Sequence, residues 1–339
     1  MKPIKILAVL GALLALGAPL PATADVTLTA SSWVPPAHAL SQTQAWWCSE
    51  VAKATAGRVK CNILPKAVAA PPAAFDAVRD GLADLTFGVH GYTPGRFVLS
   101  QLAEFPFGGA TAEANSVAYQ RVFDKHLARI GEHKGVKVLA VFTHGPGDVF
   151  NTRRPVQSVA DLQGLKFRVG GGMVNEIGKT LGTTVILKPA PESYELLSTG
   201  VMDGVFFPAE SVESFKLDKI VRHATLFPGG LYNTSFFFVM NEDAWARISK
   251  TDQDIITARF SGEAAARAFG QAWDRADKSA YTLMQTSGVK MGQASRAFMD
   301  EVRARTAGLE QKWLTDARGR GLTNADQVLK EFRTSLGLP

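Results

Sequence analysis

A single arginine at the end of a predicted strand, followed by three glycines, is the clearest candidate for chemistry in this sequence. In DLQGLKFRVGGG, residues 161–172, strand alternation places Arg168 on the face opposite Phe167 and Val169. A guanidinium offers a planar fork of donors that matches a carboxylate. Glycines let a ligand approach the backbone, and a helix predicted to begin after them would present free amides. The segment predicts an anion site, the alternative being a surface arginine on a half-exposed strand.

The signatures of nucleotide binding and of catalysis are incomplete. Gly178-Lys179-Thr180 fits the end of a phosphate-binding loop, but Met173 occupies the position of its first glycine. The glycine run 170–172 does not form GxGxxG, because the last position is Asn175. No GxSxG elbow and no HExxH motif is present. These gaps argue against a nucleotide-binding protein and against an enzyme.

The six histidines do not predict a metal site, since none has the spacing of zinc ligands. Four of them follow predicted strands or lie in loops, where binding residues concentrate: His38, His90, His144 and His223. Each alone is more often structural or solvated than a ligand contact. We predict no cofactor and no metal, while a cation accompanying the ligand stays open.

The N-terminus has the features of an export signal. Lys2 and Lys5 precede an apolar run, residues 6–16, that is too short to span a bilayer. The segment ATA, residues 22–24, then fits the small-x-small pattern of a signal peptidase site. We predict cleavage after Ala24 and a mature protein that is soluble and periplasmic.

The two cysteines fit an oxidising compartment. Cys48 lies in a predicted helix, residues 41–55, and Cys61 lies in the strand that follows it. A helix folding back on the next strand brings the two sulfurs together, so we predict a disulfide. The alternative is a pair of buried thiols.

Length and charge narrow the class further. A chain of 339 residues favours two lobes. The formal net charge of +6 suits anionic small molecules, whereas the scattered basic residues, without interleaved aromatics, do not form a nucleic-acid surface. Strands and helices alternate in two series, which predicts an α/β fold with mostly parallel sheets. Residues 252–287 lack proline and predict one long amphipathic helix.

Several segments, in order along the chain, resemble the substrate-binding proteins of tripartite ATP-independent periplasmic (TRAP) transporters, the DctP-like family. The arginine segment belongs to RRPVQSVADLQGLKFRVGGG, which resembles the family stretch that leads to the carboxylate-binding arginine. The other matching segments are SSWVPPAH, GRVKCNILP, AVRDGLADLTFG, FPF and STGVMDGVFFP. The resemblance as a whole covers nearly the whole mature chain.

The resemblance implies a type II periplasmic-binding-protein fold, with two discontinuous α/β lobes and a long helix that spans both. Residues 1–24 are then the signal peptide, residues 25–146 plus 234–274 form lobe I, and residues 147–233 plus 275–339 form lobe II. It also implies capture of an organic acid and its delivery to a membrane permease, with no chemistry on the substrate, no nucleic acid and no membrane insertion. Whether the protein is a monomer or a dimer stays open.

The resemblance makes Arg168 the clamp for the ligand carboxylate and places other residues of both lobes around it. The candidate ligand-binding residues are Trp33, His90, Tyr92, Phe107, His144, Arg168, Gly170, Met173, Phe206, Phe207, Tyr232 and Asn233.

Two departures from the family's sugar-acid binders bear on the ligand. Phe207 stands where those binders have asparagine, and Asp148 aligns with their second arginine. An aromatic face in place of a polar contact favours one carboxylate on an apolar or aromatic body, such as a 2-oxo or 2-hydroxy acid. The alternatives are that Phe207 packs in the lobe core, that the ligand is a short aliphatic or metal-chelated carboxylate, or that the protein is an exported enzyme acting on an acidic substrate.

Overall fold

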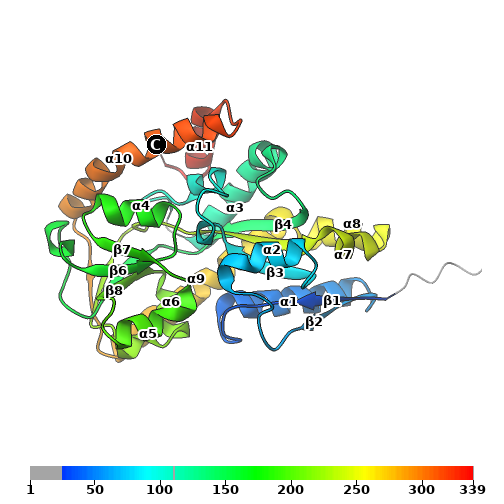
Figure 1. Ribbon diagram of the computed structural model, residues 1–339, viewed down its shortest axis with the longest axis horizontal. Coiled ribbons are helices and arrows are strands. Elements are labelled where there is room, and N and C mark those ends of the chain that lie inside the picture. Colours follow the sequence, from blue (N-terminus) through cyan, green and yellow to red (C-terminus); the bar gives the residue numbers. More distant parts are fainter. Residues whose placement is uncertain (1–24, 110, 339) are drawn as a thin grey trace, which may run out of the picture.

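The computed structural model describes residues 25–109 and 111–338, so the predicted signal peptide lies outside the described residues. Two α/β lobes lie side by side, each built on its own sheet (Figure 1). This arrangement confirms the predicted fold class. No helix among the described residues is long and apolar enough to cross a membrane.

The first sheet has five strands in the order β2-β1-β3-β10-β4. Strand β1 alternates buried Val, Leu and Ala with an exposed and a half-buried Thr, a pattern typical of a strand with one covered face. Strand β10 enters between β3 and β4 and runs antiparallel to both. The strands are β1 (Val26–Ala30), β2 (Val59–Ile63), β3 (Leu85–Val89), β4 (Val136–Thr143) and β10 (Ser235–Asn241).

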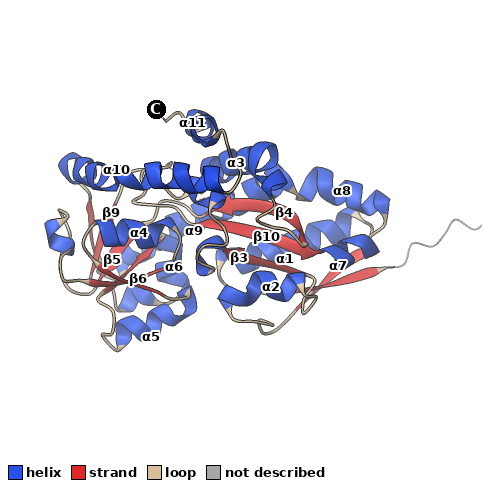
Figure 2. Cartoon of the chain, turned by 45° about the horizontal axis from the view of Figure 1, so that its top comes forward, coloured by secondary structure: helices blue, strands red, loops and turns tan. Residues whose placement is uncertain are grey.

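Helices cover both faces of this sheet (Figures 1 and 2). The first begins after His38, whose Nδ1 accepts a hydrogen bond from the Leu40 amide. The helices of this lobe are α1 (Ala39–Ala54), α2 (Ala74–Arg79), α3 (Ala112–Val122), α7 (Glu242–Arg247) and α8 (Lys250–Phe260).

The second sheet has six strands in the order β11-β9-β5-β8-β6-β7. Arg168 lies on β6, which pairs in parallel with β7 and β8. The strands are β5 (Asp148–Asn151), β6 (Lys166–Val169), β7 (Thr184–Leu187), β8 (Gly204–Phe207), β9 (His223–Leu226) and β11 (Lys290–Gln293), and the short helices beside them are α4 (Met173–Thr180), α5 (Ser193–Ser198) and α6 (Ala209–Ser214).

The chain passes from the first sheet to the second between β4 and β5, and returns between β9 and β10. It crosses again along α9 (Gly262–Thr286). The residue boundaries assigned to the lobes from the sequence stay predictions.

The long predicted helix is two helices, so the prediction of one unbroken helix over residues 252–287 was wrong. The backbone is extended at Ser261, with φ −130° and ψ 173°, and this interrupts the helical hydrogen bonds between α8 and α9. The periodic apolar residues run through both helices, which is why the pattern did not show the break.

Helix α9 holds the two lobes through its own carboxylates. Asp274 accepts hydrogen bonds from the backbone amides of Ala112 and Glu113 at the start of α3, at 2.7 and 3.0 Å. One turn later, Asp277 accepts one from the Glu210 amide at the start of α6, at 2.7 Å. A carboxylate at a helix N-terminus satisfies free amides and the helix dipole, so α9 is fixed to a helix of each lobe.

The last two helices also bridge the lobes, lying along one side of the molecule (Figure 2). Helix α10 (Arg296–Gly319) packs against α4 and against the turn Leu99–Ala103, while α11 (Ala325–Ser335) packs against α3. The indole of Trp313 on α10 donates to the Val98 carbonyl at 2.9 Å.

Cys48 and Cys61 form a disulfide, which confirms the predicted pairing. The bridge ties the buried side of α1 to β2, the edge strand of the first sheet. It therefore limits fraying where the sheet has a neighbour on one side only.

Replacing Cys48 and Cys61 together by serine should lower the free energy of unfolding by about 2–4 kcal/mol, because the unfolded chain regains the entropy that a bridge across 13 residues removes. Urea denaturation without reductant measures the difference. Superimposable curves for the wild type and the double variant would contradict a bridge in the native protein.

Candidate ligand-binding site

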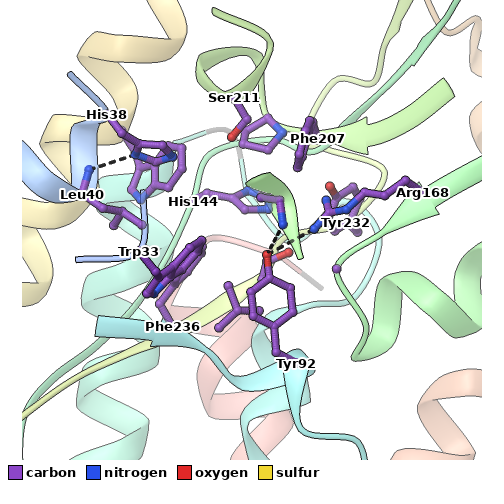
Figure 3. A pocket seen from close by; sticks show the side chains of 16 residues that line it. Trp33, His38, Leu40, Tyr92, His144, Arg168, Phe207, Ser211, Tyr232 and Phe236 are labelled. Carbon is purple, nitrogen blue, oxygen red and sulfur yellow. Dashed lines mark hydrogen bonds between the residues drawn. The ribbon is translucent and has the colours of Figure 1, made fainter. Parts of the chain in front are cut away.

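A cavity lies between the two sheets, and residues of both lobes line it (Figure 3). Its walls are mostly aromatic and aliphatic, with a few polar groups among them. The lining residues are Trp33, His38, Leu40, Val89, Tyr92, His144, Arg168, Gly170, Ala190, Phe207, Pro208, Ser211, Tyr232, Thr234, Phe236 and Trp273.

Arg168 is the one lysine or arginine in the lining, and only 2% of its surface is exposed. Its Nε donates to the Lys188 carbonyl at 2.7 Å, and its guanidinium carbon lies 4.6 Å from the ring centre of Phe207. Among the residues that the structure describes, no carboxylate lies within 4.0 Å of it. The buried positive charge is therefore oriented by neutral groups and is available to an anion.

Tyr92 connects the lobes beside this arginine. Its hydroxyl oxygen accepts a hydrogen bond from Arg168 Nη2 at 3.2 Å and one from the Ala190 amide at 2.8 Å (Figure 3). Both acceptor positions of the oxygen are then occupied, while its proton has no acceptor among these partners. The proton is free to be donated to an anion held by Arg168.

The glycines after Arg168 serve the contact between the lobes more than the approach of a ligand. A Cβ at Gly171, where φ is +76°, would overlap the carbonyl of Gly91 in the other lobe. A Cβ at Gly172, where φ is +68°, would lie 2.5 Å from Glu104 Oε2. Of the three glycines only Gly170 lines this cavity, and a Cβ there would lie 3.8 Å from Arg168 Nη2 and from the Tyr92 ring, which is an ordinary contact.

The expectation of free amides at the start of α4 was wrong. Glu104 of the first lobe accepts a hydrogen bond from the Met173 amide at 2.8 Å. Its other oxygen accepts bonds from the amide and hydroxyl of Ser235, at 3.1 and 2.5 Å. Burial raises the pKa of Glu104 to about 7 in spite of these bonds. The protein's own carboxylate thus occupies the anion site that the sequence suggested for a ligand.

Aromatic rings form the apolar part of the cavity. The indole of Trp33 is fixed by donation to the Phe87 carbonyl at 2.8 Å, and its ring lies 5.7 Å from that of Tyr92. Phe207 stacks on Phe215, with 5.9 Å between ring centres and 18° between ring planes. A flat apolar body would be enclosed between such faces.

The structure gathers seven of the predicted residues around the cavity and places five elsewhere. Phe206 precedes Phe207 on β8, so its side chain points to the opposite face of the sheet, where it packs against Phe167 at 4.7 Å. Asn233 turns away from the lining and donates to the carbonyls of His144 and Gly145 at 2.9 and 2.8 Å. These two corrections follow from neighbours in sequence facing opposite ways.

The other three residues outside the lining lie behind it or at the surface. His90 is buried in an aromatic cluster and pairs with His133, with 2.7 Å between their Nε2 atoms. Met173 belongs to the hydrophobic core beneath α4. Phe107 has φ +60° and lies under Arg303 of α10, 4.2 Å from its guanidinium carbon.

Several lining residues were not predicted from the sequence. Thr234 directly precedes β10, Phe236 lies on β10, and Trp273 lies on α9. Trp273 belongs to the helical apolar stripe, which by itself indicates core packing. His38 was noted in its loop but not assigned to the site.

Asp148, the residue aligned with a second arginine, does not line the cavity. Its carboxylate accepts hydrogen bonds from the Phe227 amide at 2.7 Å and from the Tyr281 hydroxyl at 2.8 Å. Burial raises its pKa to about 7. The folded protein therefore binds a proton at Asp148 more tightly than the unfolded chain does.

This shift predicts a pH dependence of stability. Because the folded-state pKa of Asp148 lies above the unfolded value of 3.8, its contribution is fully present below pH 4 and is lost as the pH rises through about 7. The Asp148→Asn variant keeps groups that pair with Phe227 and Tyr281 but does not titrate. Between pH 4 and 8 the free energy of unfolding should therefore fall by about 2–4 kcal/mol more in the wild type than in the variant. Urea denaturation across this range measures it, and parallel profiles of the two proteins would contradict the shift.

The model of the bacterial extracellular solute-binding protein family 7, DctP, matches residues 30–315. The chain belongs to this family. The resemblance to TRAP substrate-binding proteins is thereby confirmed. The family consists of transporter substrate-binding proteins and not of enzymes. Its members are periplasmic and work with a membrane permease.

Individual relatives of this TRAP solute-binding protein agree. The outer membrane transporter protein TsaT of Comamonas testosteroni is 32% identical over 288 residues, which cover 85% of this chain and 84% of TsaT. A TRAP periplasmic solute-binding protein of Bordetella bronchiseptica, solved with bound (R)- and (S)-mandelate, is 50% identical, with a TM-score of 0.89 over 92% of this chain and 99% of that one. A marine metagenome TRAP protein specific for aromatic acid ligands, solved with metahydroxyphenylacetate, is 33% identical, with a TM-score of 0.87 and coverage of 92% and 99%.

Proposed function

We propose that this protein captures an aromatic monocarboxylate in the cavity between its lobes and delivers it to a TRAP membrane permease. The observation that carries the proposal is a buried arginine without a carboxylate partner, set in an aromatic cavity. The structural relatives with bound mandelate and metahydroxyphenylacetate support this class of ligand.

The charges in the cavity favour one carboxylate over two. Arg168 is the only side chain in the lining with a permanent positive charge. Asp148, which aligns with the second arginine of the sugar-acid binders, lies outside the lining and is hydrogen-bonded to Phe227 and Tyr281. A second carboxylate would lie among apolar side chains such as Phe236 and Leu40, where an unpaired charge is costly. Tyr92 would donate its free proton to the carboxylate that Arg168 binds.

The enzyme alternative has no support in the lining. No aspartate, glutamate, lysine or cysteine is among the lining residues. Burial lowers the pKa of His38 and His144, so both imidazoles are poor proton acceptors at neutral pH. The proposal therefore has the ligand bound and released unchanged, with no cofactor.

Arg168→Ala should weaken aromatic-acid binding by about two to four decades, because removing one partner of a buried ion pair costs about 3–5 kcal/mol. Isothermal titration of ligand-stripped protein with mandelate and benzoate measures this loss. Arg168→Lys, which keeps the charge without the fork, should recover part of the affinity.

Arg305→Ala is the matched control, because Arg305 forms an exposed ion pair with Glu301 on α10, away from the cavity. It should bind like the wild type. Wild-type affinity in a folded Arg168→Ala protein would remove Arg168 from the site.

Phe207→Asn should lower the affinity for aromatic acids by about tenfold or more, since the ring covers Arg168 and stacks on Phe215. The same change should raise the relative affinity for sugar acids. A thermal-shift screen against aromatic, aliphatic, dicarboxylic and sugar acids reads both effects. Phe207→Leu, which keeps an apolar side chain, should retain the preference for aromatic acids. An unchanged ligand order in Phe207→Asn would make Phe207 a core residue only.

A further inference from the structure

His144 presents a lone pair to the cavity. Its Nδ1 lies 2.6 Å from the Gly145 carbonyl oxygen, which only accepts hydrogen bonds, so Nδ1 carries the proton. Burial lowers the pKa of His144 to about 4, so the ring is neutral at neutral pH. Its Nε2 is then an acceptor, and no hydrogen bond joins it to another described residue. Figure 3 shows the ring in the middle of the cavity, between His38 and Tyr232.

Trp273 supplies a donor without a partner next to it. Its Nε1–H is buried and has no acceptor among the described residues, although the residue lines the cavity. The indoles of Trp33, Trp47 and Trp313 all donate to backbone carbonyls, at 2.8, 2.7 and 2.9 Å. A buried donor left unpaired is costly and calls for a partner from outside the described residues.

The rings that carry the two groups are neighbours in the cavity lining. The ring centres of His144 and Trp273 are 5.8 Å apart, and the ring planes meet at 63°. Phe236 lies against both rings, with ring centres 6.1 and 5.9 Å away, and offers neither a donor nor an acceptor. A ligand atom between the two polar groups must accept from one and donate to the other.

We infer that His144 and Trp273 bind a hydroxyl group of the ligand, and that the protein selects hydroxylated aromatic acids over their deoxy analogues. The hydroxyl oxygen accepts from Trp273 Nε1–H, and its proton is donated to His144 Nε2. A keto oxygen satisfies Trp273 only, and a hydrogen satisfies neither group. The inference rests on the proposed function, since Arg168 must bind the carboxylate for the hydroxyl to lie between His144 and Trp273. The hydroxyl can stand on C2 of the acid or on the ring, and the test separates these two sources.

Isothermal titration at pH 7.5 compares four acids of similar size with the ligand-stripped protein: phenylacetate, mandelate, 3-hydroxyphenylacetate and phenylglyoxylate. At least one hydroxylated acid should bind about tenfold or more tightly than phenylacetate, since a site built for a hydroxyl rejects the analogue that lacks it. Preference for mandelate places the hydroxyl at C2, and preference for 3-hydroxyphenylacetate places it on the ring. If the hydroxyl stands on C2, phenylglyoxylate should bind less tightly than mandelate.

Trp273→Phe removes the N–H and keeps an aromatic ring, so the affinity ratio of hydroxylated acid to phenylacetate should fall towards one. Trp46→Phe is the matched control, because Trp46 is 44% exposed on α1 and does not line the cavity. It should leave the ratio unchanged. His144→Phe removes the acceptor and provides a second test if Trp273→Phe does not fold.

Two results would overturn the inference while leaving the proposed function intact: equal wild-type affinities for hydroxylated and deoxy acids, or an equal loss for both in Trp273→Phe. If none of the four acids binds, the proposed function itself fails and the inference falls with it.

Discussion

The guanidinium of Arg168 carries a full positive charge into a cavity closed by both lobes, and the groups around it are neutral: the Lys188 carbonyl, the Tyr92 hydroxyl and the face of Phe207. Burying a charge costs several kcal/mol unless an opposite charge compensates it. The described residues orient the cation but do not neutralise it, which is why we propose that the ligand carboxylate supplies the opposite charge. The aromatic side chains that line the cavity favour an apolar or aromatic group attached to that carboxylate.

The contacts between the lobes follow the opposite rule, because there the protein supplies its own carboxylates. Asp274 and Asp277 of α9 bind the first amides of α3 and α6, and Glu104 binds those of α4. Each carboxyl group meets a helix N-terminus and accepts a hydrogen bond from a backbone amide there. With these helix starts occupied, we propose Arg168 as the site for the ligand carboxylate.

The sequence predicts best those structural features that depend on residues close together in the chain. Alternation puts Arg168 opposite Phe167, and the ordered family segments predict two lobes. The same alternation shows why Phe206 and Phe207 cannot share a wall, a distinction that the resemblance alone does not make. Trp273 lies more than a hundred residues from Arg168, and its place in an apolar stripe looks the same whether it packs a core or faces a ligand. Only the three-dimensional fold separates those two roles.

The position of β10 has a consequence for how the chain acquires this fold. The strand lies in the interior of the first sheet, between β3 and β4, yet it ends at Asn241, after nearly all of the second sheet has been made. During synthesis from the N-terminus, β3 and β4 therefore remain without their common neighbour until that residue has emerged. The facing edges of β3 and β4 therefore stay open while about a hundred further residues are added after β4, and open edges are prone to pair with other chains. The first sheet can consequently be completed only after five of the six described strands of the second sheet have been synthesised.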